Sequence, residues 1–84
     1  MKFSLVTPQE LLAEQEATHV VLPGSEGDFG VLDGHMALIA TLREDAELLV
    51  EDAKGKKTTY TVSGGFADVN AEGVTVLAER AEAK

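Results

Sequence analysis

Short runs of strand-forming residues, separated at close intervals by turn residues, constrain the fold of this chain most strongly. The run TTYTV at residues 58–62 is β-branched and aromatic, and the run VTVL at residues 74–77 follows the turn NAEG at residues 70–73. Just before the first of these runs, Lys54-Gly55 suits a hairpin turn. This succession of short runs and turns predicts an all-β fold.

The length of the chain restricts it to one hydrophobic core. A chain of 84 residues lies near the lower end of what buries an adequate core, so residues 1–84 are expected to form a single domain. Apolar residues make up 44% of the chain, but only one tyrosine and three phenylalanines are aromatic. Aliphatic side chains must therefore fill most of the core.

The charge of the chain excludes one class of partner. With a formal net charge of −8 and only seven Lys and Arg residues, binding to nucleic acid is not expected, because binding to phosphates depends on basic side chains. The chain has no cysteine, which excludes disulfides and thiolate metal sites. It also lacks an apolar run as long as a signal or a membrane span, so we expect a soluble, cytoplasmic protein without direct membrane insertion.

Local sequence rules favour helix in one segment near the N-terminus. Thr7-Pro8-Gln9-Glu10 has the capping-box pattern with proline at the first helical position, and the following residues to position 17 are good helix formers. Taken alone, residues 7–17 are predicted to be helical. Residues 44–52 and 77–84 are also rich in Ala, Glu and Leu, but either segment suits a strand equally well if tertiary pairing overrides propensity.

The stretch GSEGDFG at residues 24–30 spaces three glycines in a way that raises the question of a phosphate-binding loop. Such a loop opens a helix and usually carries a lysine, whereas here Glu26 and Asp28 would repel a phosphate and the residues that follow indicate strand. We therefore interpret the stretch as a tight turn between two strands, in which glycine permits positive φ.

No combination of side chains indicates catalysis or a resident cofactor. His19 and His35 with Asp33 lack the spacing of a zinc site, so no metal is predicted. Ser63 does not lie in a nucleophile motif, and the Gly64-Gly65 pair beside it indicates a bulge or bend in a strand. Neighbouring carboxylates such as Glu51 and Asp52 would point to opposite faces of a strand. We expect no catalytic residue and no cofactor site.

Four stretches, taken together in order and spacing, resemble the N-terminal domain of the epsilon subunit of the F-type ATP synthase: FSLVTPQELLAEQEATHVVLPGSEGDFGVLDGH, LIATLR, VSGGFADV and VTVLAE. The resemblance covers about residues 3–82. It implies a flattened sandwich or barrel of about ten strands in two sheets, which the turn-punctuated pattern allows. It also replaces the predicted helix at residues 7–17 by a turn at Thr7-Pro8 and a second strand.

The resemblance also implies a function and two contact surfaces. Domains of this family sit at the foot of the rotating central stalk, bind the gamma subunit and contact the membrane rotor ring of c subunits, so that proton-driven rotation is coupled to ATP synthesis. This chain would then be a non-catalytic subunit, peripheral at the cytoplasmic face of the bacterial inner membrane. By position in the motifs, the ring-facing loop is Glu26, Gly27, Asp28 and Phe29, and the gamma-facing edge is His35, Leu38 and Thr41.

The chain departs from the family pattern in two places. Many relatives have prolines where this chain has Asp33 and Ala37, and a Pro-Gly turn where it has Glu44-Asp45. Family members also usually continue into a C-terminal helical hairpin that restrains rotation and in some binds ATP, whereas this sequence ends at Lys84, so neither property is expected here. The alternatives are a free-standing β-sandwich module that binds a small ligand, which the few aromatics disfavour, and a small hydrolase, for which no nucleophile and base are present.

Overall fold

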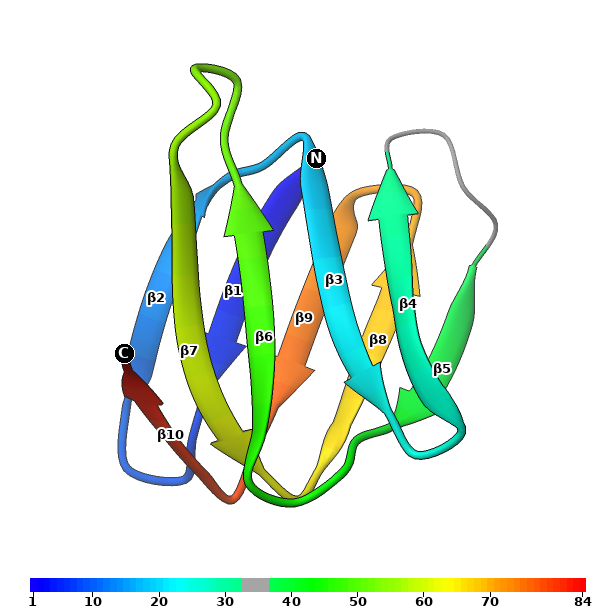
Figure 1. Cartoon of the computed structure of the whole chain (residues 1–84), viewed down its shortest axis with the longest axis vertical. Helices are drawn as coiled ribbons and strands as arrows, with labels where there is room; N and C mark the ends of the chain where they lie inside the picture. The colour runs from blue at the N-terminus through cyan, green and yellow to red at the C-terminus, as the bar shows by residue number, and fades with distance from the viewer. Residues whose placement is uncertain (33–36) are drawn as a thin grey trace.

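The chain folds into two packed antiparallel-rich sheets. The computed structural model describes residues 1–32 and 37–84, which form ten strands in two five-stranded sheets (Figure 1). The first sheet has the order β2-β1-β9-β8-β5, and the second has the order β10-β7-β6-β3-β4. In chain order the strands are β1 (Lys2–Val6), β2 (Leu11–Glu16), β3 (His19–Gly24), β4 (Gly27–Leu32), β5 (Leu38–Thr41), β6 (Ala46–Glu51), β7 (Lys57–Ser63), β8 (Phe66–Asn70), β9 (Gly73–Leu77) and β10 (Arg80–Ala83). The predicted all-β class and the ten-stranded sandwich are both confirmed.

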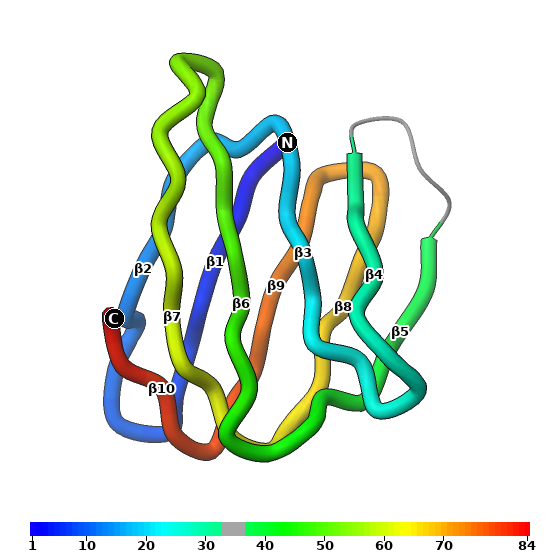
Figure 2. Tube along the Cα trace, viewed as in Figure 1, coloured from blue at the N-terminus to red at the C-terminus, as the bar shows by residue number. Residues whose placement is uncertain are grey.

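The chain passes repeatedly from one sheet to the other, as the trace in Figure 2 shows. Within the described residues every strand pairing is antiparallel except that of β1 with β9, which runs in register from Lys2 opposite Gly73 to Val6 opposite Leu77. This parallel pair places a strand from the start of the sequence beside a strand from near its end. It places β1 inside the first sheet, between β2 and the central strand β9.

The helix that local rules predict for residues 7–17 is wrong. Residues 7–10 form the turn of the β1–β2 hairpin, where the Thr7 amide donates to the Glu10 carbonyl (2.9 Å) and the Glu10 amide returns a bond to the Thr7 carbonyl (3.3 Å). β2 then pairs antiparallel with β1. Pairing with a buried neighbour gives the backbone its hydrogen bonds and lets Leu12 and Ala13 pack against the core. This gain outweighs the helix propensity of these residues, which contributes little free energy per residue. The other two ambiguous segments are also strands, β6 and β10.

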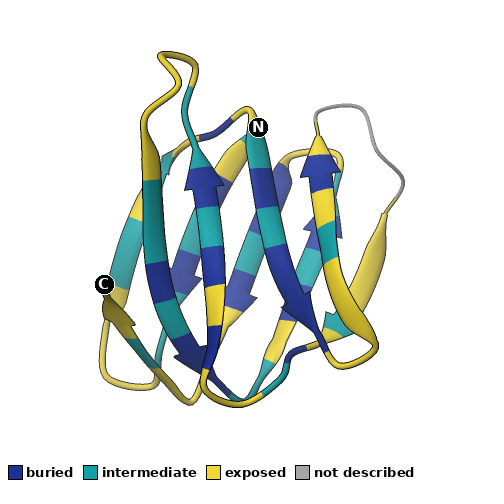
Figure 3. Cartoon of the chain, in the orientation of Figure 1, coloured by how far each residue is buried: buried dark blue, intermediate teal, exposed yellow. Residues whose placement is uncertain are grey.

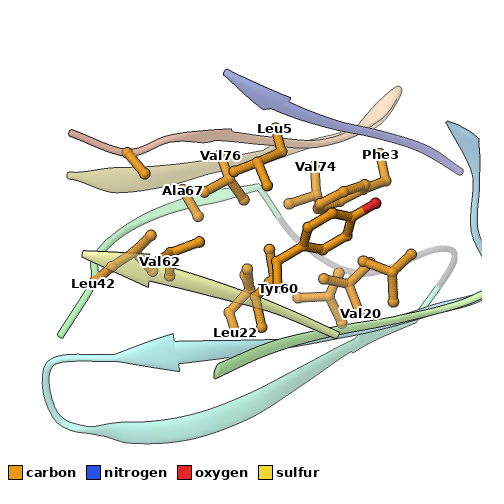
Figure 4. Close-up of a cluster of buried hydrophobic side chains, with 14 of the residues drawn as sticks. Phe3, Leu5, Val20, Leu22, Leu42, Tyr60, Val62, Ala67, Val74 and Val76 are labelled. Carbon is orange, nitrogen blue, oxygen red and sulfur yellow. The ribbon is translucent and has the colours of Figure 1, made fainter. Parts of the chain in front are cut away.

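The core is aliphatic and lies between the sheets. Burial alternates along most strands, as Figure 3 shows, because successive side chains point to opposite faces. Phe3 and Tyr60 face each other from opposite sheets, with ring centroids 6.3 Å apart (Figure 4). Around them pack the aliphatic side chains of the core, which include Leu5, Val20, Leu22, Leu48, Val50, Val62, Val69, Val74 and Val76.

Gly64 and Gly65 carry the chain from β7 in the second sheet to β8 in the first. Both have positive φ, and a Cβ built on Gly65 would lie 1.8 Å from the Leu77 carbonyl oxygen. No side chain fits there. The Gly65 carbonyl accepts a hydrogen bond from the Leu42 amide (3.1 Å), which ties the crossing to the residues after β5. The prediction of a bend at this glycine pair is confirmed.

The two ends of the sandwich differ in what they contain. We call one the crossing end: it holds the β3–β4 turn, residues 7–10, 42–45 and 64–65, and residues 78–79 (Figure 1). We call the opposite one the tip end, because the β6–β7 hairpin projects there beyond the other strands (Figure 1). The candidate site lies at the crossing end.

A candidate protein-binding surface at the crossing end

The stretch GSEGDFG forms the hairpin that joins β3 to β4. Gly24 pairs with Gly27, which leaves Ser25 and Glu26 as a two-residue loop, and Gly27 has a φ of 136°. A Cβ on Gly24 would lie 2.9 Å from both the Gly27 carbonyl oxygen and the Phe29 ring, so the glycine also permits close packing. The interpretation as a tight turn between strands is confirmed. The glycine N–H groups belong to a hairpin and do not form a phosphate cradle.

The four residues predicted to face the rotor ring have different surroundings. Glu26, Gly27 and Asp28 are exposed, whereas the Phe29 side chain is half-buried against the core. Asp28 is held within the chain, because Arg43 Nη2 lies 2.6 Å from its Oδ1. Arg43 Nη1 also donates to the Gly24 carbonyl oxygen at 2.8 Å. Glu26 is therefore the carboxylate of the turn that an external partner can bind without breaking an ion pair of the described residues.

The predicted gamma-facing residues lie on or beside β5, an edge strand of the first sheet. Leu38 and Thr41 are both exposed, while His35 lies outside the described residues. The register shows that Leu38 and Thr41 belong to opposite faces of the strand: Leu38 lies opposite the buried Val69. Ile39, which is 72% exposed, shares the outward face with Thr41.

The structure brings the two predicted surfaces together. The Ser25 amide donates to the Thr41 carbonyl oxygen at 2.8 Å, so the end of β5 is hydrogen-bonded to the β3–β4 turn. Between them lies a hollow of about 300 Å³, whose lining includes Glu26, Phe29, Ile39 and Thr41. A partner that contacts the edge of β5 would also contact this turn.

An apolar stripe crosses the outward face of the first sheet at the crossing end. Val6 of β1 is opposite Leu77 of β9, Leu77 is opposite Phe66 of β8, and Phe66 is opposite Thr41 of β5. Phe66 is 41% exposed and Leu77 is 38% exposed. We use the name apolar stripe for Val6, Leu77, Phe66 and the adjacent exposed Pro8, which line a hollow of about 550 Å³.

Sequence reasoning missed this stripe and Arg43. A signal for the stripe was present, because Phe66 and Leu77 each lie next to a buried strand residue and so fall on the outward positions of the alternation. Large apolar side chains at outward positions of several strands indicate a surface that is covered by a partner. Their assembly into one stripe depends on which strands are neighbours.

The residues weighed for catalysis and metal binding are dispersed. His19 Nδ1 lies 3.9 Å from a Glu51 carboxylate oxygen on the outward face of the second sheet. Ser63 is buried, and its hydroxyl oxygen accepts a hydrogen bond from the Asp45 amide at 3.4 Å. Within residues 1–32 and 37–84, no group of three His, Cys, Asp or Glu side chains is placed to hold a metal ion. Nor does this part of the chain contain a helix that is long and apolar enough to cross a membrane.

Comparison with known proteins identifies the family. The family model described as the ATP synthase delta/epsilon chain β-sandwich domain matches residues 1–84. ATP synthase epsilon chains of Fuscovulum blasticum and Maricaulis maris are 47% and 43% identical over 81 residues, 96% of this chain in each case. The chain spans 61% and 59% of the length of these two relatives.

Solved structures agree with this match. A chain in the OSCP/F1/c-ring structure of the Euglena gracilis mitochondrial ATP synthase superposes with a TM-score of 0.87 at 35% identity, over 96% of this chain and 51% of that one. A chain in the central stalk/c-ring structure of the Tetrahymena thermophila enzyme has a TM-score of 0.77 at 17% identity, over 98% of this chain and 65% of that one, and so shares the fold. The chain belongs to the family of β-sandwich domains of the ATP synthase delta/epsilon chain.

Proposed function

We propose that this chain is the β-sandwich domain of an ATP synthase epsilon subunit, a non-catalytic component of the central stalk. In this role it binds the gamma subunit and the membrane rotor ring, so that proton-driven rotation of the ring is coupled to ATP synthesis. Support comes from the family match over residues 1–84 and from the relatives, which are ATP synthase epsilon chains. Since these relatives are bacterial, we place the chain at the cytoplasmic face of the inner membrane as a peripheral subunit and treat it as a single domain.

The apolar stripe is the observation that best supports the proposed contact with gamma. Its side chains lie on the outward face of three neighbouring strands, β1, β9 and β8, and of the turn after β1. The outward face continues through Thr41 to Ile39 on the edge strand β5. An exposed apolar patch of this kind on a small domain is typical of a protein interface, because burying it against a partner removes apolar surface from water. We extend the predicted gamma-facing edge of Leu38 and Thr41 to include Phe66 and Leu77. His35 remains a prediction.

Glu26 is the residue we assign to the ring contact. It is exposed in the two-residue loop, and the Arg43–Asp28 ion pair fixes the flank of that loop. We therefore give Asp28 a positioning role within the turn, while Gly27 provides the backbone conformation and Phe29 anchors the turn to the core. A carboxylate in this position contributes register and association rate at a basic or amide-rich surface more than it contributes affinity.

A matched pair of substitutions on opposite faces tests the assignment. Leu77→Glu puts a charge in the apolar stripe, and Leu49→Glu puts the same charge on the outward face of the second sheet, where Leu49 is half-buried. We expect the epsilon subunit with Leu77→Glu to lose copurification with gamma and to abolish proton-coupled ATP synthesis in the reconstituted enzyme. The subunit with Leu49→Glu should keep both.

Melting curves of both variants exclude unfolding as the cause. Two results would contradict the proposal: a Leu77→Glu subunit that still copurifies with gamma, or coupling that is the same with and without the subunit. A ligand-binding module would show no dependence on gamma in either assay.

A further inference from the structure

The tip of the β6–β7 hairpin concentrates positive charge on an acidic protein. Lys54, Lys56 and Lys57 are all exposed there, and they are three of the seven Lys and Arg residues in a chain of net charge −8. The hairpin projects beyond the neighbouring strands at the end opposite the β3–β4 turn (Figure 1). The chain therefore has an acidic turn at one end and a basic tip at the other.

Like Arg80, these three lysines have no carboxylate partner among the described residues, whereas the other three basic side chains do. Lys2 pairs with Glu14 (3.4 Å), Arg43 pairs with Asp28 (2.6 Å), and Lys84 pairs with Glu47. Of the carboxylates near the tip, Asp52 belongs to its loop and Glu51 lies opposite Lys57 in the strand pairing. Glu51 also lies 3.9 Å from His19, and Glu16 lies 3.5 Å from the N-terminal amino group. Asp52 and Glu51 offset part of the positive charge of the tip, but neither forms an ion pair with one of its lysines.

The backbone of the tip is fixed in advance of any contact. Asp52 Oδ1 accepts hydrogen bonds from the amides of Lys54 and Lys56, both at 2.9 Å, and the Asp52 amide donates to the Lys56 carbonyl oxygen at 3.0 Å. Gly55, with a φ of 83°, completes the turn. Because Asp52 Oδ1 accepts hydrogen bonds from backbone amides, Asp52 orders the backbone of the loop without pairing with a lysine ammonium group. A preordered loop loses less entropy when it binds.

We propose that this tip, formed by Lys54, Lys56 and Lys57, docks on an acidic segment of a neighbouring protein subunit. The proposal rests on the function proposed above, which turns the crossing end toward the ring in the membrane. The tip then points away from the membrane, so a protein carboxylate cluster fits its position and an anionic lipid surface does not. The contact would act mainly on association rate and orientation, as exposed charge pairs do.

Zero-length carbodiimide cross-linking of the intact ATP synthase tests the contact, because it joins a lysine amine only to a carboxylate that touches it. We expect cross-links from Lys54, Lys56 or Lys57 to Asp or Glu residues of another subunit. The ion pairs Lys2–Glu14 and Lys84–Glu47 should cross-link within the chain and so show that the reagent has reacted. Intrachain cross-links without any from the tip would overturn the proposal.

A charge-neutral variant and a charge-preserving one test the energetic effect. Replacing all three lysines by Gln should slow association of the subunit with the complex about tenfold at low salt, the scale of three exposed ion pairs, whereas replacing them by Arg should not. The difference should vanish near 1 M salt, where charges are screened within about 3 Å. Equal association rates of the Gln and Arg variants at low salt would overturn the proposal.

Two further measurements separate this proposal from its alternatives. If the tip instead served the membrane, the assembled soluble sector would bind vesicles of phosphatidylcholine and phosphatidylglycerol, and the Gln variant would lose that binding. Such a result would overturn the protein contact. Copurification with gamma should persist in the Gln variant, since the apolar stripe is at the other end of the domain. Failure of the tip proposal therefore leaves the gamma assignment standing.

Discussion

The crossing end and the tip end of this sandwich are stabilised in different ways. At the crossing end, loops that are distant in sequence hydrogen-bond to one another: the Arg43 amide to the Pro23 carbonyl oxygen (2.9 Å), the Leu42 amide to that of Gly65 (3.1 Å), and the Ala78 amide to that of Val6 (3.0 Å). At the tip end, Thr18 bonds to the carbonyl oxygens of Glu51 and Asp52 at the base of the β6–β7 hairpin, and beyond Asp52 the hairpin loop closes on itself. The crossing end is a joined platform, whereas the loop of the β6–β7 hairpin beyond Asp52 is a local unit.

This difference corresponds to the two kinds of contact proposed for them. An apolar stripe binds by shape, so its side chains must be held in place relative to one another, and the bonds between loops provide that rigidity. A cluster of exposed lysines binds through charge, which acts over several ångströms and needs only a local scaffold. A change of backbone should therefore be transmitted through the whole fold at the crossing end and stay confined at the tip.

The same substitution at the two ends gives the sharpest test of this comparison. In Gly65→Ala, the new Cβ would overlap the Leu77 carbonyl oxygen at 1.8 Å, whereas in Gly55→Ala it would meet only Glu51 Oε2 at 4.0 Å. Both glycines have positive φ, which alone costs alanine about 1–2 kcal/mol. We expect Gly65→Ala to lose more than about 3 kcal/mol and thus over about 12 °C of melting temperature, with Gly55→Ala losing about 5 °C.

Circular dichroism melts of the two purified variants check this expectation. Similar melting temperatures for Gly65→Ala and Gly55→Ala would show that the crossing end is no more tightly joined than the tip.

A second, smaller effect should follow loss of the Arg43 side chain. Arg43→Met removes the ion pair with Asp28 and the hydrogen bond to the Gly24 carbonyl oxygen while retaining a long apolar side chain. Since the pair is partly exposed, we expect a loss of about 1 kcal/mol in the free energy of unfolding, measured by urea titration. Lys57→Met at the tip is the control and should change it by less than about 0.5 kcal/mol. An equal loss of unfolding free energy in Arg43→Met and Lys57→Met would show that the Arg43 side chain does not stabilise the crossing end.

Sequence patterns predicted the strands and turns of this fold where local and tertiary preferences agree. The β-branched run in β7, the strand β9 and the bend at Gly64-Gly65 were all predicted from residue type. At residues 7–17 the preferences conflict, and the local helix prediction is wrong because β2 gains its hydrogen bonds and burial from β1. Only the family resemblance corrected that segment.

The candidate surface was predictable only in part, for a geometric reason. Alternation shows that Phe66 and Leu77 are outward, but not that β1 lies beside β9 or that β5 lies beside β8. Those pairings join residues far apart in the chain, and they create the stripe. In the same way, the Arg43–Asp28 pair depends on the approach of two separate loops. Composition gives charge, whereas only the fold shows which charges are already paired.

The smallest expected effect is at the tip, where Asp52→Ala removes the acceptor for the Lys54 and Lys56 amides. Both amides can turn to water at this exposed loop, so we expect a cost of only about 0.5–1 kcal/mol. The change should appear as faster hydrogen exchange at Lys54 and Lys56, while the amides of Leu42 and Ala78 at the crossing end keep their protection, because the hairpin loop opens as a local unit. Asp52→Asn, which retains the Oδ1 acceptor, should restore slow exchange. Faster exchange at Leu42 or Ala78 in the Asp52→Ala variant would instead mean that the two ends open together, and that the division into a joined platform and a local unit is wrong.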